Sequence, residues 1–361
     1  MVDVTVERLS KKFGGLNAVD DVSFTVPSGT VLTLLGPSGC GKTTILRCIA
    51  GLETATGGRI SIGGDPVFDS ERDILVPSEK REIGMVFQSY AIWPHLTVFQ
   101  NVAFPLKLRS VGKAELQERV MAALKSVDLD HLHDRYPNQL SGGQQQRAVL
   151  ARCLVYRPRV LLLDEPLANL DAALREEMRF ELREVQQKFG LTSIYVTHDQ
   201  SEAMALSDNI LVLSGGSIIS SGSPREVFSK PQHRFVASFL GGANLIPARI
   251  VVGRQGPPQI VGIDAAGALL VEGEGDVGLA TTVSVRPSDV SLVPVGKTDP
   301  VAVTGTLRRV TFLGEVNDCV VEIAGCEIRA RTDPDGQWQI GETVGIAFHP
   351  SRTYLLAAED K

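Results

Sequence analysis

Five short apolar runs, each bounded by turn-forming residues, stand out in the N-terminal part of the chain. They are VLTLLG (31–36), GMVF (84–87), VLLLD (160–164), SIYVT (193–197) and NILVL (209–213). Runs that are apolar at consecutive positions are typical of strands covered on both faces of a sheet, because neither face then meets water. The pattern therefore predicts a buried sheet built from these segments.

Helical patterns separate the runs. In residues 172–190, AALREEMRFELREVQQKFG, apolar side chains recur at helical spacing, and the final glycine suits the end of a helix. The predicted buried face consists of Leu174, Met178, Leu182, Val185 and Phe189. Strands that alternate with helices indicate an α/β domain with a mostly parallel sheet. The richer helical signal of residues 89–157 predicts a helical lobe within it.

The pattern changes near Gly241 and Gly242. Short alternating segments follow, such as TTVSVRPSDVSLV and NDCVVEIAGCEIRARTD, and glycine and proline interrupt them. This pattern is typical of a small all-β domain, and we expect a partly open barrel resembling an oligonucleotide/oligosaccharide-binding (OB) fold. The predicted organisation is an α/β domain over residues 1–240 and an all-β domain over residues 241–361.

Composition narrows the possible functions. The 361 residues carry a formal net charge of -6, which argues against a broad nucleic-acid-binding surface. No apolar stretch approaches the roughly 18 residues that span a bilayer, and the N-terminus has no signal-peptide pattern. We therefore expect a cytoplasmic protein that reaches a membrane only through another protein. The five cysteines fit no zinc or redox spacing and are expected to be reduced thiols.

The segment GPSGCGKT matches the phosphate-loop pattern G-x-x-x-x-G-K-[ST] and lies between a predicted strand and a predicted helix. Its glycines allow backbone N–H groups to wrap a phosphate chain, and the helix N-terminus favours an anion. Lys42 is expected to reach the β- and γ-phosphates, and the Thr43 hydroxyl to bind Mg²⁺. The predicted nucleotide-binding residues here are Gly36, Pro37, Ser38, Gly39, Cys40, Gly41, Lys42, Thr43 and Thr44.

Three other predicted strands end in polar residues that can serve the same site. VLLLDEP contains Asp164 and Glu165, SIYVTHD contains His198, and GMVFQ contains Gln88. Ligands bind beyond the carboxyl ends of parallel strands. We therefore expect Asp164 to hold Mg²⁺ and Glu165 to act as general base toward the attacking water. His198 is expected to reach the γ-phosphate, and Gln88 to contact Mg²⁺ or that water.

The segment LSGGQQQR, residues 140–147, is by itself compatible with a simple turn before a helix. Beside a phosphate loop it predicts a second phosphate site, because Ser141 can cap the helix and Gly142 and Gly143 leave backbone N–H groups accessible. One chain does not need two sites for one γ-phosphate. We therefore expect a two-fold dimer in which each chain offers Ser141–Gln144 to the nucleotide of the other.

About residues 1–240 contain, in this order, the segments GPSGCGKTT, VFQ, LSGGQQQR, VLLLDEP, NLD and THD. These segments resemble the motifs of the ATP-binding cassette (ABC) ATPases. The resemblance implies ATP as the nucleotide and assigns the motif roles to the residues named above. It adds Asp171 of the NLD loop, and Phe13 at the position that stacks on adenine. Where the family more often has serine, this chain has Ala168, which puts only fine tuning of contacts across the dimer in doubt.

The C-terminal part resembles the regulatory β domain (TOBE-like) of import ATPases of the maltose, polyamine, sulfate and ferric-iron group, on NLIPARI and VSVRPSDVSLV. This resemblance implies the ATP-hydrolysing subunit of an importer for a small solute. It also implies a membrane permease as partner and, indirectly, an extracytoplasmic solute-binding protein. The general character of the sequence favours ferric iron or a polyamine as the cargo.

Two other function classes fit the sequence less well. A soluble cassette protein acting on ribosomes or nucleic acid would often carry two cassettes or coiled coils, whereas this chain has one cassette and no heptads. A phosphate-loop kinase or GTPase is disfavoured by LSGGQQQR and by the lack of an N-K-x-D-type segment.

Three sites carry open alternatives. Trp93 and Pro94 lie in an apolar loop after Gln88 and are interpreted either as a permease contact or as core of the helical lobe. Cys40 is either a reactive thiol at a helix N-terminus or an inert small residue. His131 and His133 have a spacing that allows a metal site but also suits a solvated loop.

Overall fold

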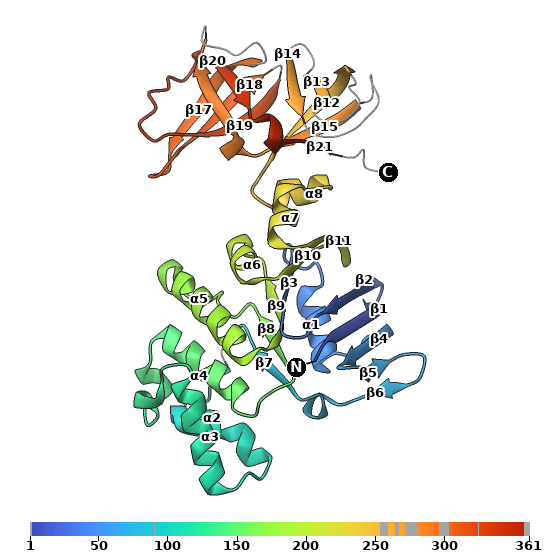
Figure 1. The fold of residues 1–361 in the computed structure, drawn as a ribbon, viewed down its shortest axis with the longest axis vertical. Helices are drawn as coiled ribbons and strands as arrows, with labels where there is room; N and C mark the ends of the chain where they lie inside the picture. The colour runs from blue at the N-terminus through green and yellow to red at the C-terminus, as the bar shows by residue number, and fades with distance from the viewer. Residues whose placement is uncertain are drawn as a thin grey trace. The chain divides into compact units, whose positions relative to one another are not determined.

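The structure, a computed structural model, describes residues 2–89, 91–252, 259–263, 267–271, 280–295, 303–323 and 325–356. The contacts between residues divide the chain into two compact units, Met1–Pro224 and Arg225–Lys361. Figure 1 labels the helices and strands of both units.

A six-stranded sheet in the order β11-β10-β3-β9-β8-β7 forms the centre of the first unit. Its strands are β3 (Val31–Leu35), β7 (Ile83–Val86), β8 (Val160–Asp164), β9 (Thr192–Thr197), β10 (Asn209–Ser214) and β11 (Ser217–Gly222). The pairs from β10 to β7 are parallel, and β11 adds an antiparallel edge. The five predicted strands and the mostly parallel sheet are therefore confirmed.

The two faces of this sheet contact two different hydrophobic clusters. Val160 and Leu162 of β8 pack with α1 (Lys42–Ala50), whereas Leu161 and Leu163 pack with the helices on the opposite face. This alternation explains why the strand is apolar at every position.

An antiparallel sheet in the order β2-β1-β4-β5-β6 was not predicted from the sequence. Its strands are β1 (Val4–Phe13), β2 (Leu16–Val26), β4 (Gly57–Ile62), β5 (Asp65–Asp69) and β6 (Ile74–Leu75). Apolar residues of β1, β2 and β4 share one cluster with α1 and the parallel sheet. Figure 1 shows α1 between these strands and the parallel sheet. Helix α1 is thus covered on two sides.

The remaining helices of the first unit include a group within residues 89–157, where the helical lobe was predicted. The helices of this group are α2 (Val98–Leu108), α3 (Lys113–Lys125) and α4 (Gly142–Leu154). Two more helices, α5 (Ala172–Phe189) and α6 (Gln200–Leu206), follow later in the chain. The predicted core residues Val98, Val102 and Leu106 are fully buried, and they share a cluster with residues of α5 and the sheet. The lobe is therefore packed into the same core as the sheet.

Helix α5 ends as the sequence predicts, with Gly190 in a left-handed conformation at φ 61°. Three of the five predicted face residues, Met178, Leu182 and Val185, are buried. The prediction is wrong for Phe189, which is 44% exposed because it lies in the last helical turn, beyond the core. Leu174 is partly buried.

The second unit contains two five-stranded antiparallel sheets, in the orders β14-β13-β12-β15-β21 and β16-β20-β17-β18-β19. The strands are β12 (Asn244–Val252), β13 (Gln259–Ile263), β14 (Gly267–Val271), β15 (Ala280–Val285), β16 (Val290–Pro294), β17 (Val303–Phe312), β18 (Asn317–Ile323), β19 (Cys326–Thr332), β20 (Thr343–Phe348) and β21 (Thr353–Leu356). The predicted all-β fold of the C-terminal part is confirmed, and residues of both sheets share one core.

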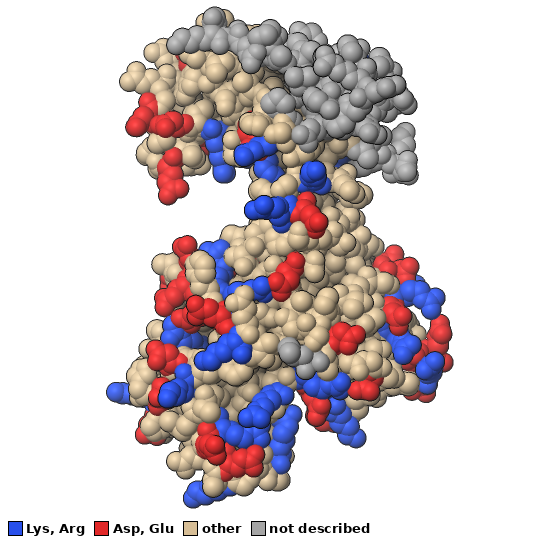
Figure 2. Space-filling model, viewed as in Figure 1, with Lys and Arg blue, Asp and Glu red and all other residues tan. Residues whose placement is uncertain are grey.

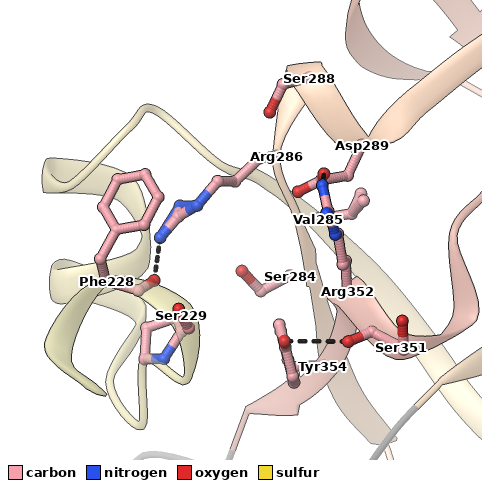
Figure 3. Close-up of a pocket in the computed structure, with 11 residues that line it drawn as sticks. Phe228, Ser229, Ser284, Val285, Arg286, Ser288, Asp289, Ser351, Arg352 and Tyr354 are labelled. Carbon is pink, nitrogen blue, oxygen red and sulfur yellow. Dashed lines mark hydrogen bonds and ion pairs between the residues drawn. The ribbon is translucent and has the colours of Figure 1, made fainter. Parts of the chain in front are cut away.

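Arg286 explains why this unit begins earlier than the predicted boundary at residues 240 and 241. Its guanidinium donates to the carbonyls of Phe228 and Leu240 and lies 3.6 Å from the centre of the Phe228 ring. These two residues belong to the ends of α7 (Pro224–Ser229) and α8 (Arg234–Phe239). The arginine, which follows β15, therefore fastens both helices to the β domain (Figure 3).

Figure 3 also shows the cavity beside this arginine, which has a volume of about 350 Å³. On its opposite wall Arg352 pairs with Asp289 at 2.8 Å. Both arginines thus use guanidinium N–H groups for contacts within the unit, which is what a structural tether requires.

Within the described residues, the structure contains no helix that is both long enough and apolar enough to span a membrane. On the face of the first unit that Figure 2 presents, acidic and basic side chains are interspersed. Their charges largely offset one another on this face.

Replacing Arg286 with Met should loosen α7 and α8, because two carbonyls lose their donor and the ring loses its cation. We expect a loss of about 2 kcal/mol in the stability of this attachment. Faster hydrogen exchange of the α7 and α8 amides would report it. The control is Arg308→Met, since Arg308 is exposed and, among the residues that the structure describes, forms an ion pair only with Glu322 at the surface of the same unit. Equal exchange in the two variants would contradict the tether.

Candidate functional site

Four strands of the parallel sheet, β3, β7, β8 and β9, point the same way, so that their carboxyl ends meet at one edge. The phosphate loop follows β3, and Gln88 follows β7 after one residue. Asp164 ends β8, and His198 follows β9 directly. The topology thus brings the predicted catalytic and nucleotide-binding strand ends to one edge.

Two glycines of the phosphate loop have no room for a side chain. A Cβ on Gly41 would lie 2.3 Å from the carbonyl oxygen of Ala18, and its φ of +101° is left-handed. A Cβ on Gly36 would lie 2.4 Å from the carbonyl oxygen of Leu213. The loop therefore packs tightly against β2 and the end of β10, and its backbone path depends on glycine.

Two residues of the phosphate loop, Cys40 and Lys42, have buried side chains. Lys42 is 5% exposed, and its Nζ donates to the carbonyls of Gly36 and Pro37 at 2.8 and 2.9 Å. These two hydrogen bonds give the buried Lys42 ammonium partners within the loop. The loop is also where we expect the phosphates of the nucleotide to bind. Cys40 is buried in the hydrophobic cluster around α1. This position supports the interpretation of Cys40 as a small packing residue over that of a reactive thiol.

Thr43 and Asp164 form the pair of oxygen donors predicted for Mg²⁺. The Thr43 hydroxyl donates to Asp164 Oδ1 at 2.9 Å. Burial raises the pKa of Asp164, against the lowering effect of this hydrogen bond and of the charges on Arg47 and Lys42. A hydroxyl and a carboxylate at hydrogen-bond distance are hard oxygen ligands, and a divalent cation would favour the ionised carboxylate. The donor set therefore fits Mg²⁺.

Glu165 lies at the centre of the site. Its Oε2 accepts a hydrogen bond from Gln88 Nε2 at 3.2 Å, and its Oε1 lies 3.1 Å from His198 Nδ1. Its backbone is left-handed, with φ 45°, which is rare for a residue with a side chain. Glu165 thus contacts both of the other residues predicted as catalytic, although Gln88 and His198 are 110 positions apart in the sequence.

Glu202 of α6 supports the same edge and was not found from the sequence. It is 3% exposed, and its Oε2 accepts hydrogen bonds from Tyr195 at 2.9 Å and Thr197 at 2.7 Å. The Thr197 hydroxyl in turn accepts from the Asp199 backbone N–H at 2.9 Å. These bonds fix the turn on either side of His198. The signal was weak, because a glutamate in a short helix usually indicates a solvated position.

Phe13 ends β1 and is 48% exposed, with Lys11 Nζ 4.7 Å from its ring centre. The ring is therefore open on the surface, as stacking on adenine would require. Among the described residues, no hydrogen bond or ion pair joins Phe13 to the strand-end cluster, which consists of Gln88, Asp164, Glu165 and His198.

The LSGGQ segment begins α4. Ser141 and Gln144 form reciprocal side-chain-to-backbone hydrogen bonds of 3.0 and 3.3 Å, which cap the helix. A Cβ on Gly143 would lie 2.9 Å from the Leu174 side chain, so this glycine allows α4 to approach α5. Gly142 is partly exposed. No described hydrogen bond or ion pair joins this segment to the phosphate loop of the same chain.

Asp171 caps α5, and its side chain accepts from the Leu174 backbone N–H at 3.0 Å. It is exposed, so the carboxylate has a structural contact and remains accessible. His131 is grouped with Asp128 and Asp130, whose possible ligand atoms lie within 4.8 Å of one another. His133 is outside that group and contacts Asp130 O and Asp134 instead.

Trp93 is partly buried, and Pro94 is exposed. The Trp93 ring centre lies 4.5 Å from that of Phe104, and Arg152 lies over the ring at 4.6 Å. Asn101 bonds both the N–H and the carbonyl of Trp93. The part of this loop around Trp93 is thus held in a defined conformation on α2.

Replacing Glu202 with Gln should change how stability depends on pH. Burial raises the pKa of Glu202, against the lowering effect of the hydrogen bonds from Thr197 and Tyr195, so folding favours its protonated form. Stability from this group is therefore present at acid pH and is lost as the pH rises through the folded pKa. Gln keeps an oxygen for both donors and does not ionise.

The melting temperature of Glu202→Gln, relative to the unmodified chain, should thus rise between about pH 5 and about pH 8. Glu176→Gln is the control, because Glu176 is exposed on α5. A difference from the unmodified chain that stays constant with pH would contradict a raised pKa.

Comparisons with known proteins agree with this geometry. The family model for the ABC transporter matches residues 19–168, and the TOBE domain matches residues 283–356. The structure of cbiO1 from Clostridium perfringens, part of the ABC transporter complex cbiONQ, has a TM-score of 0.58 and 33% identity and covers 63% of this chain and 90% of that one. The dimeric structure of MJ0796, a bacterial ABC transporter cassette, has a TM-score of 0.53 and 30% identity, over 62% and 99%.

Relatives similar over their whole length are import ATP-binding proteins. The Fe(3+) ions import ATP-binding protein FbpC of Escherichia coli (strain K12) is 44% identical over 98% of this chain and 97% of the relative. FbpC of Rhizobium etli is 45% identical, over 99% and 96%. The spermidine/putrescine import ATP-binding protein PotA of Aliivibrio fischeri is 41% identical, over 99% and 96%. With the cassette motifs at one sheet edge and a TOBE domain after them, the chain belongs to the ATP-binding subunits of ABC transporters and is an ATPase.

Proposed function

We propose that this chain energises the import of ferric iron through a membrane permease by hydrolysing ATP. The observation that carries the proposal is the contact of Glu165 with both Gln88 and His198 beside Lys42 and Thr43. Two of the relatives described above are named for Fe(3+) import and one for spermidine and putrescine, so a polyamine is the second candidate cargo.

ATP would lie along the phosphate loop. Backbone N–H groups of residues 36–44 and the Lys42 ammonium would bind its phosphates, and the exposed ring of Phe13 would stack on adenine. Thr43, Asp164 and the Gln88 side-chain oxygen would hold Mg²⁺. That ion would neutralise charge on the β- and γ-phosphates.

Hydrolysis would begin with a water molecule beside Glu165. Its carboxylate would accept the proton of this water as the oxygen attacks the γ-phosphorus, and the β–γ bond would break. His198 would hold the carboxylate on one side and reach the γ-phosphate on the other. Gln88 would align the water from the third direction, which is consistent with its bond to Glu165 Oε2.

A second copy of the chain would complete the site. The Ser141–Gln144 segment has no described bond to its own phosphate loop, whereas its glycines and helix N-terminus suit an anion. Each copy would place this segment on the γ-phosphate of the other, with Asp171 close to the junction. The related cassette MJ0796 has a dimeric structure, which is consistent with a site completed by a second copy. ATP would then close the dimer, and hydrolysis would open it.

The permease would dock on the loop after Gln88. This loop is the place where a partner can sense the nucleotide, because Gln88 contacts Glu165 while Trp93 and Pro94 lie only a few residues away. The subunit would work on the cytoplasmic face of the membrane. An extracytoplasmic binding protein would select the cargo, and the TOBE-like domain would stabilise or regulate the dimer.

The alternative is a soluble cassette that acts on ribosomes or nucleic acid. A pull-down from native membranes with tagged Glu165→Gln protein and ATP separates the two functions. Recovery of a multispanning permease supports import, and its binding protein then identifies the cargo by titration with ferric iron and spermidine. Recovery of ribosomal or nucleic-acid partners alone would refute the transport role.

The Glu165→Gln chain should hydrolyse ATP at least about 100-fold more slowly, because an amide cannot accept the proton of water. Its affinity for ATP should be unchanged, since Lys42 and the loop amides are intact. Phosphate release and equilibrium binding measure the two effects. Lys42→Ala is the matched variant that should lose binding instead. Normal turnover by Glu165→Gln would exclude Glu165 as the general base.

Trp93→Ala should lower transport by more than about tenfold, as large aromatic residues often dominate interfaces. ATPase activity of the isolated subunit should persist, because Trp93 does not contact the strand-end cluster. Uptake and hydrolysis are measured in the same reconstituted transporter, with Trp93→Phe as the conservative control. Equal loss of uptake and hydrolysis would contradict the assignment of Trp93 to the permease contact.

A further inference from the structure

Arg175 connects two loops of the candidate site. It lies in the first turn of α5, and its Nη2 donates to the Leu170 carbonyl at 2.9 Å. Its Nη1 lies 3.8 Å from Asp199 Oδ2. Leu170 precedes Asp171, and Asp199 follows His198. One guanidinium therefore contacts both the loop that follows Glu165 and the turn that carries His198.

The Asp199 end of this link is firmly held. Its Oδ1 accepts the backbone N–H groups of Ser201 and Glu202 at 2.7 and 3.1 Å, which caps α6. Burial raises the pKa of Asp199. The hydrogen bonds from Ser201 and Glu202 and the charge on Arg175 lower it by more, so the pKa lies below its ordinary value. Asp199 is therefore an ionised and oriented partner for the arginine.

The link also borders the general base. Arg175 lines a cavity of about 40 Å³ together with Glu165, His198 and Ala168. Among the described residues, Arg175 Nε is buried and has no hydrogen-bond partner. A buried unpaired N–H costs free energy. Its two outer nitrogens, by contrast, both have partners, the Leu170 carbonyl and the Asp199 carboxylate.

We propose that Arg175 is a positioning residue that couples the loop of residues 165–171 to the His198 turn. The proposal rests on the function proposed above, in which Asp171 lies near the partner's nucleotide site and His198 reaches the γ-phosphate. Through Asp199, Arg175 fixes the turn that keeps His198 Nδ1 at 3.1 Å from Glu165 Oε1.

The coupling requires the shape of arginine. A planar guanidinium presents donors in two directions, so it can hold a carbonyl and a carboxylate at once. A lysine ammonium carries the same charge on a single atom and cannot span both groups. Arg175→Lys therefore keeps the charge, removes the unpaired Nε and breaks the link, which separates coupling from charge and from stability.

Arg183 supplies the matched control on the same helix. It donates to the Leu206 carbonyl at 3.1 Å and to Asp208 Oδ1 at 2.5 Å, so it also joins α5 to a carbonyl and a carboxylate. Its contacts lie at the other end of α6, away from both loops. The side chains have similar exposure, 31% for Arg175 and 25% for Arg183.

The experiment compares ATP hydrolysis by the full chain with that of Arg175→Lys and Arg183→Lys. We expect kcat of Arg175→Lys to fall about tenfold below that of Arg183→Lys, because His198 is no longer held in place. KM for ATP and the melting temperature of Arg175→Lys should change little. Equal kcat values in the two variants, or a loss of kcat that follows the melting temperature, would overturn the coupling.

A double-mutant cycle with Asp199→Asn gives a second test, since Asn keeps the oxygen that caps α6. If Arg175 acts through Asp199, adding Asp199→Asn to Arg175→Lys should lower kcat no further. Additive losses would refute the link. If the unmodified chain hydrolyses no ATP, the proposed function itself fails. If it is active and Arg175→Lys equals Arg183→Lys, only the coupling fails.

Discussion

The pairing of β8 with β9 is the constraint on which the rest of the site depends. The parallel register places Asp164 beside Val196, and the Glu165 N–H bonds the Val196 carbonyl at 3.0 Å, one residue beyond the strand. At that point the chain turns into a left-handed conformation. The side chain of Glu165 therefore turns toward His198, which follows the neighbouring strand, rather than continuing the alternation of the sheet.

The left-handed turn at Glu165 is tolerated because the strands of the parallel sheet are held in place. Both faces of the parallel sheet are covered, by α1 on one side and by α5 and the helical lobe on the other. Interiors of this kind resist small displacements. The covered sheet thus holds the ends of β3, β7, β8 and β9 in place relative to one another. This arrangement suits a site whose functional groups come from four different strand ends.

Sequence patterns predicted the parts of the fold that depend on local order. Consecutive apolar residues mark the buried parallel strands, and glycine-rich segments mark the phosphate loop, because these signals need no knowledge of distant contacts. The sheet around β1 escaped prediction since its register with β2 shifts at several points, which disturbs the alternation of a regular strand. The predicted burial of Phe189 was wrong for a related reason, because helical spacing does not show where along a helix the core ends.

The candidate site shows the same division. Residues in motifs were found by spacing, and the structure brings Gln88, Glu165 and His198 into contact. Glu202 was missed because a buried carboxylate is expected only where donors are available, and its donors are Tyr195 and Thr197 on a strand. Arg286 was missed because its partners lie about 50 positions away, across the predicted domain boundary.

The arginines of this chain illustrate how such distant contacts are used. Arg81 bonds the carbonyls of Cys48 and Ile49 at the end of α1, Arg183 bonds that of Leu206 at the end of α6, and Arg286 that of Leu240 after α8. In each case a cation meets the negative end of a helix, an arrangement that stabilises a terminus and fixes it to a neighbouring element. Arg175 breaks this pattern. Its carbonyl partner lies in a loop, and its carboxylate partner lies at the start of a helix, where a cation gains nothing from the helix dipole. Unlike the positions of these three arginines, that of Arg175 is explained by the two loops that it joins rather than by a helix end.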